Sequence, residues 1–190
     1  MRYLKKLALL LPIVLAGCEV PEEAVSGAKP LPRLYRINPA DSTTVQYRMV
    51  DSINALRGAA GLEAVAQNAA LNAAAATHAR DMSRQNRPWH FGSDGSSPLD
   101  RVARVGYTGQ FLGENISETY ETELETLSAW MTQADTRDVI MDPRADELGF
   151  AWHQDANGKI WWMVIVGRTV QSESEKLDEL LGLSNTADQG

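Results

Sequence analysis

The amino-acid sequence predicts an α+β fold in which several helices come first and a β-hairpin comes last. Three observations carry this prediction. Apolar residues recur at helical spacing between residues 43 and 131, and the segment Leu148–His153 alternates as a strand does. Between that segment and the next apolar run stands Asn157-Gly158, a dipeptide that favours a tight hairpin turn. Helices followed by a hairpin favour an antiparallel sheet covered by helices.

The first helix is expected after Pro39–Ser42. Thr43 and Gln46 have the spacing of a capping box, in which the two side chains satisfy free backbone groups at the helix start. The apolar residues that follow fall on one helical face: Val45, Met49, Ile53 and Leu56. Gly58 and Gly61 are expected to end the helix.

The second helix is expected from Ala69 to about Gln85, with Asn68 as its N-cap. One stripe of this helix holds Leu71, Ala75, His78 and Met82. A loop rich in Gly, Ser and Asp follows over residues 86–96. The third helix is expected to begin at Ser97-Pro98, because Pro is favoured in a first turn, and to end at Gly106.

An irregular strand is expected over Tyr107–Ser117, before a fourth helix. Thr122 and Glu125 form a second possible capping box, and the apolar residues of that helix are Leu124, Leu127 and Trp130 or Met131. After the hairpin turn, Ile160–Val166 is apolar enough for a central strand, with Trp161 and Trp162 on opposite faces. In the polar tail, Leu177, Leu180 and Leu181 fit one short amphipathic helix, and residues 184–190 are expected to be disordered.

The N-terminus has the pattern of a bacterial lipoprotein signal. Basic residues precede an apolar run, Leu7–Ala16, that is too short to span a bilayer. The run ends in Leu15-Ala16-Gly17-Cys18, which resembles a lipobox. Residues 1–17 are therefore predicted to be a signal peptide, and Cys18 is predicted to carry lipid. Since Cys18 is the only cysteine, no disulfide supports the fold.

The rest of the chain divides by composition into three parts. Residues 18–40 are interpreted as the lipidated N-terminus and a tether, residues 41–170 as the folded domain, and residues 171–190 as a polar tail. Three of the 18 Lys and Arg lie in the signal and no acid does, so the mature net charge falls from −7 to −10. Such a charge argues against nucleic acid and anionic headgroups as partners. Glu19, rather than Asp, follows Cys18, which predicts the outer membrane, periplasmic face.

Several short motifs occur in a family-specific order between about residues 45 and 168. They are His78-Ala79-Arg80-Asp81-Met82, the stretch from His90 to Pro98, Gly106-Tyr107, Gly113-Glu114-Asn115-Ile116, Trp130, Asp142-Pro143, Glu147-Leu148-Gly149-Phe150 and the stretch from Trp162 to Gly167. Together they resemble the CAP superfamily of cysteine-rich secretory proteins, antigen 5 and pathogenesis-related 1 proteins, and most of all its bacterial secreted SCP-like branch.

The resemblance implies a three-layer α-β-α sandwich with a small antiparallel sheet and a cleft. In the family this cleft holds two His and two acidic residues, and in some members a divalent metal. By motif, His90 matches the first cleft His, and Glu114 and Glu147 match the acids. Thr136 stands where the second His is expected, although Arg137 and the residues after it keep the register.

The substitution at Thr136 weakens the metal hypothesis, because zinc needs three or four N, O or S ligands. His153 is not expected to replace the missing His unless a bulge intervenes, since six strand residues, roughly 20 Å, separate it from Glu147. His78 and Asp135 remain candidate third groups beside His90 and Glu114. No cofactor is required by the sequence, and a divalent metal at His90 and Glu114 stays an alternative.

Structural roles compete with each of these functional interpretations. His78 lies on an apolar stripe, where a hydrogen-bonded core histidine is favoured over a ligand. His90 can fix its loop, Glu114 can accept backbone N–H groups, and Asn115 is expected to be structural. A hydrolase built from Ser96 or Ser97, His90 and Glu114 is conceivable, but Ser97 is better explained as an N-cap. The sequence contains neither Gly-x-Ser-x-Gly nor His-Glu-x-x-His.

Two functions follow from this pattern. The first is a non-enzymatic binding or scaffold module, anchored to the envelope, that recognises a small amphipathic ligand, a glycan or an envelope protein in the cleft around His90 and Glu114. The alternative is a metal-assisted hydrolase acting on envelope polymer or peptide. Thr136 favours the first function, and the presence of both His90 and Glu114 keeps the second open.

Overall fold

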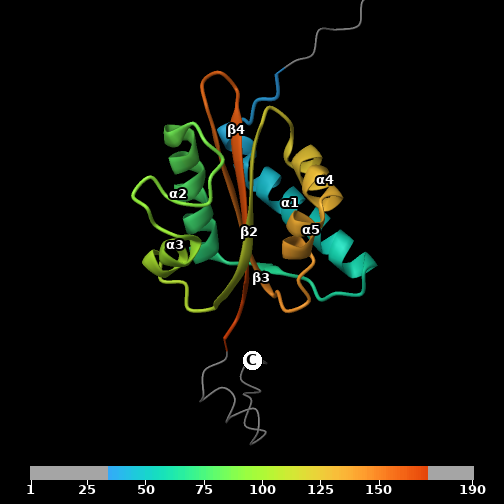
Figure 1. The fold of residues 1–190 in the computed structure, drawn as a ribbon. Helices are drawn as coiled ribbons and strands as arrows, with labels where there is room; N and C mark the ends of the chain where they lie inside the picture. The colour runs from blue at the N-terminus through green and yellow to red at the C-terminus, as the bar shows by residue number, and fades with distance from the viewer. Residues whose placement is uncertain (1–33, 171–190) are drawn as a thin grey trace, which may run out of the picture. The chain divides into compact units, whose positions relative to one another are not determined.

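The structure is a computed structural model that describes residues 34–170. The predictions for the signal peptide, Cys18, most of the tether and the C-terminal tail lie outside the described residues. The elements, in chain order, are η2 (Pro39–Asp41), α1 (Ser42–Ala59), β1 (Ala66–Gln67), α2 (Ala69–Gln85), α3 (Pro98–Arg104), β2 (Gln110–Thr119), α4 (Glu123–Thr132), α5 (Ala134–Ile140), β3 (Glu147–Gln154) and β4 (Ile160–Arg168) (Figure 1).

The four strands form one sheet in the order β1-β3-β4-β2. β4 pairs antiparallel with both β3 and β2, so it is central, as its apolar sequence predicts. β1 pairs parallel with β3, which makes the sheet mixed rather than wholly antiparallel. β2 lies at the opposite edge from β1, and this free edge becomes important for the candidate site.

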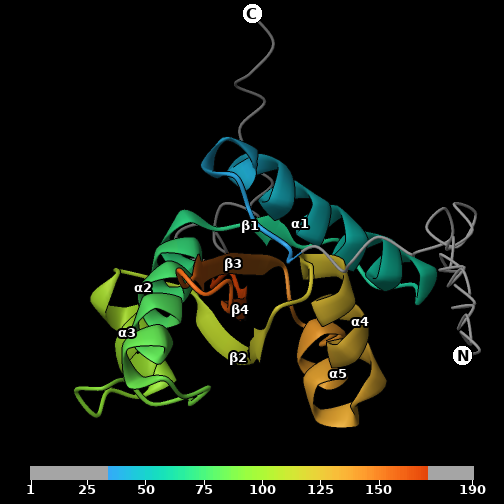
Figure 2. The same cartoon turned by 90° about the horizontal axis from the view of Figure 1, so that it is seen from above.

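Helices cover both faces of the sheet, which confirms the three-layer α-β-α sandwich. α2 and α3 lie on one face, and α1, α4 and α5 lie on the other (Figure 2). Each interface has its own apolar core, and alternate residues of β4 serve the two cores. Trp162 packs in the core of α1 and α4, whereas Trp161 packs in the core of α2, and both side chains are fully buried.

Three helix starts are capped as the sequence predicts. The Asn68 side chain accepts the backbone N–H of Leu71 at the start of α2. Capping boxes begin α3 at Ser97 and α4 at Thr122. Each cap satisfies backbone donors that the helix itself leaves free, which fixes where these helices begin.

The predicted capping box of the first helix is wrong. α1 begins at Ser42 with Asp41 as its N-cap and no side-chain cap, because the short helix η2 runs directly into it. Gln46 instead donates its side-chain N–H to the carbonyl of Phe150 on β3. The side chain that the capping box would use therefore joins α1 to the sheet.

Two apolar residues predicted to face the core are exposed, and their charged neighbours are buried instead. Leu56 and Leu124 lie at the surface, while Arg57 and Glu123 are fully buried. Arg57 donates to the carbonyls of Glu63, Ile140, Asp142 and Ala145, so its charge is matched by carbonyl dipoles inside the fold. Burial of a charge is tolerated when its donors are satisfied in this way.

Three features of the fold were not predicted. α5 and the two-residue strand β1 are short and carry no strong periodic pattern. The domain also starts before residue 41: the Tyr35 hydroxyl donates to Glu123, and Ile37 N–H donates to the Gln154 side chain. Residues 34–40, assigned to the tether by sequence, therefore pack on the domain. Within residues 34–170, none of the helices is both long and apolar enough to cross a membrane.

Candidate functional site

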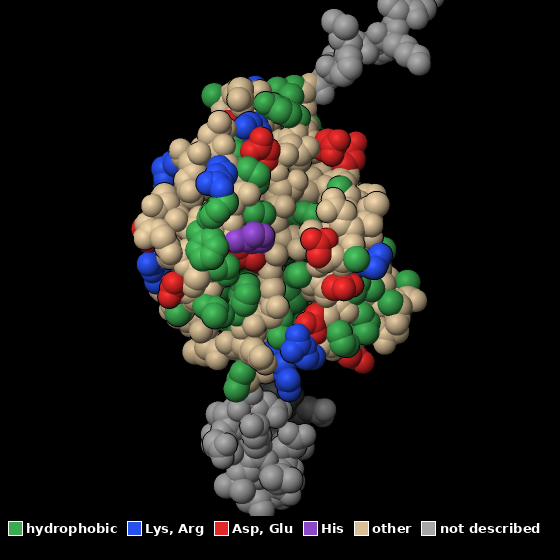
Figure 3. Space-filling model, in the orientation of Figure 1, with side chains coloured by type: hydrophobic (Ala, Val, Ile, Leu, Met, Phe, Trp, Pro, Cys, Tyr) green, Lys and Arg blue, Asp and Glu red, His purple; other side chains and the backbone are tan. Residues whose placement is uncertain are grey.

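The candidate site lies along β2, the edge strand between the two helical layers. Figure 3 shows this face as a shallow groove with an exposed histidine, between the side that carries α2 and α3 and the side that carries α4 and α5. Glu114 contacts Arg101 of α3, whereas its neighbour Asn115 donates to the carbonyl of Thr136 on α5. Because successive strand residues point to opposite faces, β2 reaches both walls of the groove.

Glu114 is held by Arg101, a residue that sequence analysis did not select. Nη2 of Arg101 lies 3.0 Å from each carboxylate oxygen of Glu114, and both side chains are buried. The same Glu114 Oε1 lies 2.9 Å from Nδ1 of His90. The carboxylate that the family motif places in the cleft is therefore paired with a buried guanidinium, and the imidazole of His90 is oriented by the pair.

His78 is buried in the same network. Its Nδ1 accepts a hydrogen bond from Nη1 of Arg101, since a guanidinium can only donate, and this leaves Nε2 to donate to the Trp89 carbonyl at 2.7 Å. Burial, and then the charge of Arg101, lower the pKa of His78 below 6.5. His78 is therefore a neutral core histidine with both ring nitrogens engaged, and neither is free to bind a metal.

His90 differs from His78 because its ring reaches the surface. The side chain is 53% exposed, and Nδ1 is the nitrogen that contacts Glu114. The loop around it is fixed from below, because the carbonyl of His90 accepts a hydrogen bond from Arg101 Nη2. The structure thus brings His90 and Glu114 together, as the motif implies, and presents Nε2 as the nitrogen that is not bonded to the carboxylate.

Thr136 lies across β2, near the start of α5, and its groups are already paired. Its hydroxyl donates to the Trp130 carbonyl at 2.6 Å, and its backbone N–H donates to the Asp135 carboxylate. The backbone carbonyl accepts from Asn115. Thr136 therefore joins α4, α5 and β2, while Asp135 lies in the first turn of α5 and accepts from the neighbouring backbone N–H.

Glu147 and His153 lie away from His90 and Glu114. Glu147 stands at the start of β3, two strands from β2, where it accepts hydrogen bonds from Tyr107 and Asn68. Burial and the bond to Glu147 raise the pKa of Tyr107. His153 lies near the hairpin, with Nε2 3.4 Å from Asp155. Glu147 therefore holds the Tyr107 hydroxyl by a hydrogen bond and is not part of the groove beside His90.

The residues present do not fit a divalent metal. Within the described part of the chain, no three His, Cys, Asp or Glu side chains lie close enough to hold one ion. The stronger objection is the donor chemistry at Glu114, whose two oxygens both accept from Arg101. A metal would have to compete with this fixed positive charge for the same lone pairs.

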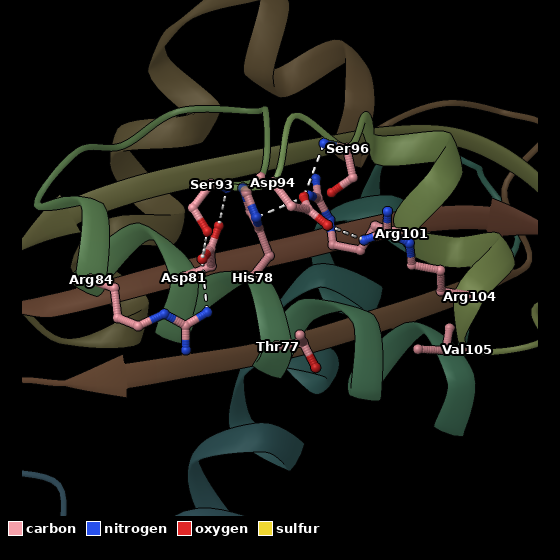
Figure 4. A pocket seen from close by; sticks show the side chains of 11 residues that line it. Thr77, His78, Asp81, Arg84, Ser93, Asp94, Ser96, Arg101, Arg104 and Val105 are labelled. Carbon is pink, nitrogen blue, oxygen red and sulfur yellow. Dashed lines mark hydrogen bonds and ion pairs between the residues drawn. The ribbon is translucent and has the colours of Figure 1, made fainter.

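A pocket of about 310 Å³ lies beside the network, between α2, α3 and the loop after α2. Figure 4 shows Asp81 with the side chains that hold it. Burial by itself raises the pKa of Asp81, but hydrogen bonds from Ser93, Arg84 and Gln85 outweigh it and bring the pKa to about 2. The polar groups of this pocket thus hold the loop that carries His90.

No strong sequence signal identifies Arg101. It lies in a seven-residue helix beside two other charged residues, Asp100 and Arg104, and an Arg in such a helix is most often exposed. The exposed aromatic residues Trp89 and Phe91, on either side of His90, were also not selected. Their signal is an aromatic-polar-aromatic triplet in a loop, which indicates a surface that is not needed for the core.

Comparisons with known proteins agree with the motifs. The model of the Cysteine-rich secretory protein family, CAP, matches residues 50–166. The uncharacterized protein YkwD of Bacillus subtilis (strain 168) is 26% identical over 130 residues, which cover 68% of this chain and 50% of that protein. The chain thus spans about half the length of this curated relative.

Two solved structures share the fold. An extracellular SCP-domain protein from Bacillus anthracis str. Ames has a TM-score of 0.62 at 19% identity, and the match covers 71% of this chain and 45% of that protein. An outer surface protein from Borrelia burgdorferi has a TM-score of 0.59 at 15% identity, and the match covers 73% of this chain and 100% of that protein. With the family match over more than half of its length, this chain belongs to the CAP family of cysteine-rich secretory proteins.

Proposed function

We propose that this protein is a lipid-anchored CAP module of the bacterial cell envelope that binds a ligand at the groove around His90 and Glu114 and does not transform it. The ligand classes that suit the groove are a small amphipathic molecule, a glycan or an envelope protein. Membrane attachment would come from lipid on Cys18 rather than from a spanning helix.

The observation that carries the proposal is the buried contact between Arg101 and Glu114. Nη2 of Arg101 donates to both oxygens of Glu114 at 3.0 Å, and the Arg101 side chain is only 6% exposed. A carboxylate held in this way is a poor general base and a poor metal ligand, because the buried positive charge of Arg101 opposes the gain of a proton or of a cation. The pair instead holds the exposed imidazole of His90 in one orientation, and a preorganised polar group of this kind favours ligand binding.

The envelope location draws on two further observations. The first 18 residues have the lipobox pattern described above. Two structural relatives are named as an outer surface protein and an extracellular protein. Lipid on Cys18 would place the domain outside the cytoplasm, and two or more acyl chains are enough for stable anchoring.

Calorimetric titration of the purified full-length protein with zinc alone tests the non-catalytic interpretation. We expect no tight one-to-one binding. Zinc binding in that stoichiometry that disappears in His90→Ala would overturn the proposal. A second titration, with vesicles of the zwitterionic lipid phosphatidylcholine and with peptidoglycan fragments, tests binding itself, and the absence of any His90-dependent signal across these probes would also overturn it.

Replacement of Cys18 tests the anchor. In cells fed radiolabelled palmitate, the wild-type protein should incorporate label and fractionate with membranes. Cys18→Ala should lose both the label and the membrane fraction, because no other cysteine can accept lipid. Unchanged membrane fractionation of Cys18→Ala would contradict lipid anchoring without bearing on the groove.

One observation favours a second function, the hydrolase. His90 is half exposed, and a buried carboxylate contacts its Nδ1, which is how a general base is oriented in many hydrolases. In this function His90 Nε2 would take the proton from an attacking water. Turnover of envelope polymer or peptide that is lost in His90→Ala and kept in His153→Ala would favour it over binding alone.

A further inference from the structure

Three successive backbone carbonyls in the loop after α2 are held by side chains from the helices. The carbonyl of Trp89 accepts from His78, and the carbonyl of His90 accepts from Arg101. The carbonyl of Phe91 accepts from Gln85 at 3.3 Å. Because all three carbonyls accept hydrogen bonds from side chains, the backbone of residues 89–91 is fixed. We call the side chains of these three residues the displayed triplet.

Both aromatic side chains of the displayed triplet are exposed to solvent, which is unfavourable for large apolar groups. Trp89 is 38% exposed and Phe91 is 47% exposed, whereas Trp130, Trp161 and Trp162 are buried. The two aromatic rings lie with their centroids 6.0 Å apart and their planes tilted by 52°. Nothing in the packing of the core requires these rings, so a rigid loop that presents them outward indicates a contact surface.

The charge beside the triplet is positive. The Arg87 guanidinium lies 3.4 Å from the centroid of the Trp89 ring, and within the described residues it makes no ion pair. The nearest carboxylate to His90, that of Glu114, is already matched by Arg101. Figure 3 shows the blue side chains gathered mostly on the α2 and α3 side of the groove and the red ones mostly on the α4 and α5 side.

We propose that the displayed triplet, Trp89, His90 and Phe91, together with Arg87, is a binding site for an oligosaccharide that carries carboxylate groups. This inference rests on the binding function proposed above and names its ligand class. Aromatic rings, which have an electron-rich face, suit the C–H face of a sugar ring. His90 Nε2 would bond a sugar hydroxyl, and Arg87 would pair with the carboxylate.

An acyl chain fits this surface less well than a sugar. Buried lipid tails need a largely apolar, enclosing cavity. Here the two rings share their loop with the half-exposed imidazole of His90, and a guanidinium covers part of the Trp89 ring. Exposed aromatic rings that share a loop with an imidazole and a guanidinium instead match the C–H and hydroxyl groups of a pyranose.

Calorimetry with two oligosaccharides tests the proposal on the purified full-length protein. One is a tetrasaccharide of alternating N-acetylglucosamine and N-acetylmuramic acid, whose lactyl groups supply carboxylates. The other is the N-acetylglucosamine tetrasaccharide, which lacks them. We expect the carboxylated sugar to bind at least about threefold more tightly, with a preference that shrinks as salt is added, because an exposed ion pair is screened.

Four variants locate the site. Trp89→Ala and Phe91→Ala should each weaken binding by about tenfold, in the range of a contact residue at the centre of an interface. Arg87→Gln should remove the preference for the carboxylated sugar and leave neutral-sugar binding. The matched control is Tyr47→Ala, an exposed aromatic residue on α1 at the opposite face of the sheet, which should change nothing. If Trp89→Ala lowers the thermal midpoint, Trp89→Phe should retain measurable binding.

The outcomes separate this inference from the proposed function. Binding of neither sugar, or equal binding by all four variants, overturns the sugar assignment. If vesicles or peptides still bind and lose binding in His90→Ala, the ligand class is wrong while the binding function stands. If no probe of any class binds, both proposals fall.

Discussion

Arg101 and Glu114 form a buried charge pair. Nη2 of Arg101 donates to both carboxylate oxygens of Glu114, and Nη1 donates to Nδ1 of His78. α3 and β2 are thereby joined to α2 by one side chain. The position of His90 also depends on this pair, because Arg101 holds its carbonyl and Glu114 holds its ring. The pair is therefore the structural centre of the candidate site.

Arg101→Leu should lower the free energy of unfolding by about 3–5 kcal/mol, because it leaves the Glu114 carboxylate buried and unpaired. The double variant Arg101→Leu/Glu114→Leu should lose much less than the sum of the two single losses. Urea denaturation of the wild type, Arg101→Leu, Glu114→Leu and the double variant measures this coupling. Arg104→Leu is the matched control, since its pair with Asp94 is exposed and screened by water, so its loss should change stability little. Additive losses would contradict the pair's central role.

The pH dependence of stability should report His78. Burial, followed by the charge of Arg101, lowers the folded-state pKa of His78 below the unfolded value of 6.5. Between those two values the unfolded chain binds more protons, so stability should fall as pH drops below about 6.5. His78→Gln, which keeps an acceptor and a donor, should flatten this part of the curve, measured by urea denaturation from pH 7.5 to pH 5. An unchanged curve would mean that another group causes the acid loss.

Asp81 should stabilise the conformation of the loop that carries the displayed triplet. Hydrogen bonds outweigh burial and lower the folded-state pKa of Asp81 from 3.8 to about 2, so its stabilising effect is complete above pH 3.8 and disappears as pH falls toward 2. Asp81→Asn should cost roughly 2 kcal/mol at neutral pH. It should also speed amide exchange at Ser93, whose N–H donates to this carboxylate. Unchanged exchange at Ser93 would contradict the role of Asp81.

Local signals in the sequence were sufficient where one residue type decides the backbone. Asn68, Ser97 and Thr122 cap helices in the structure because their short side chains accept N–H groups that no helix can satisfy internally. The alternating residues of β3 and the apolar run of β4 predicted those two strands equally well. Thr43 has the same local pattern, but η2 continues into α1 and removes the need for a cap.

The candidate site could be predicted only in part, because its partners are distant in sequence. The motifs place His90 and Glu114 together, and the structure does the same. Glu147 matches its motif equally well, yet the order of the strands puts it two strands away, beside Tyr107. Arg101 was missed because its burial depends on the carboxylate and the imidazole that the fold brings to it. No periodic pattern records such a contact.

A close approach of β3 to α2 gives a test of the packing. A Cβ at Gly149 would lie 2.2 Å from the backbone carbonyl carbon of Leu71, so the helix and the sheet would have to separate. Gly149→Ala should therefore cost at least about 1–3 kcal/mol. Gly58→Ala is the matched control in α1, where the added Cβ meets nothing within 4 Å, and it should stabilise by up to about 1 kcal/mol. Thermal melts compare them, and equal midpoints would contradict the close packing.

Thr136→His tests whether Arg101, rather than the missing histidine, prevents metal binding. The Thr136 backbone lies next to β2, where its carbonyl accepts from Asn115, so a histidine there would restore the residue type that the family motif has. By itself this change should not produce tight zinc binding, because the positive charge of Arg101 still lies 3.0 Å from both oxygens of Glu114 and repels a cation. Thr136→His/Arg101→Met should bind zinc at least about tenfold more tightly than Thr136→His, since the carboxylate is then available as a ligand. Zinc should also raise the thermal midpoint of the double variant, because a ligand that binds only the folded state stabilises it. Tight zinc binding by Thr136→His alone would show instead that the histidine was the only missing part, and that Glu114 can leave Arg101 for a metal.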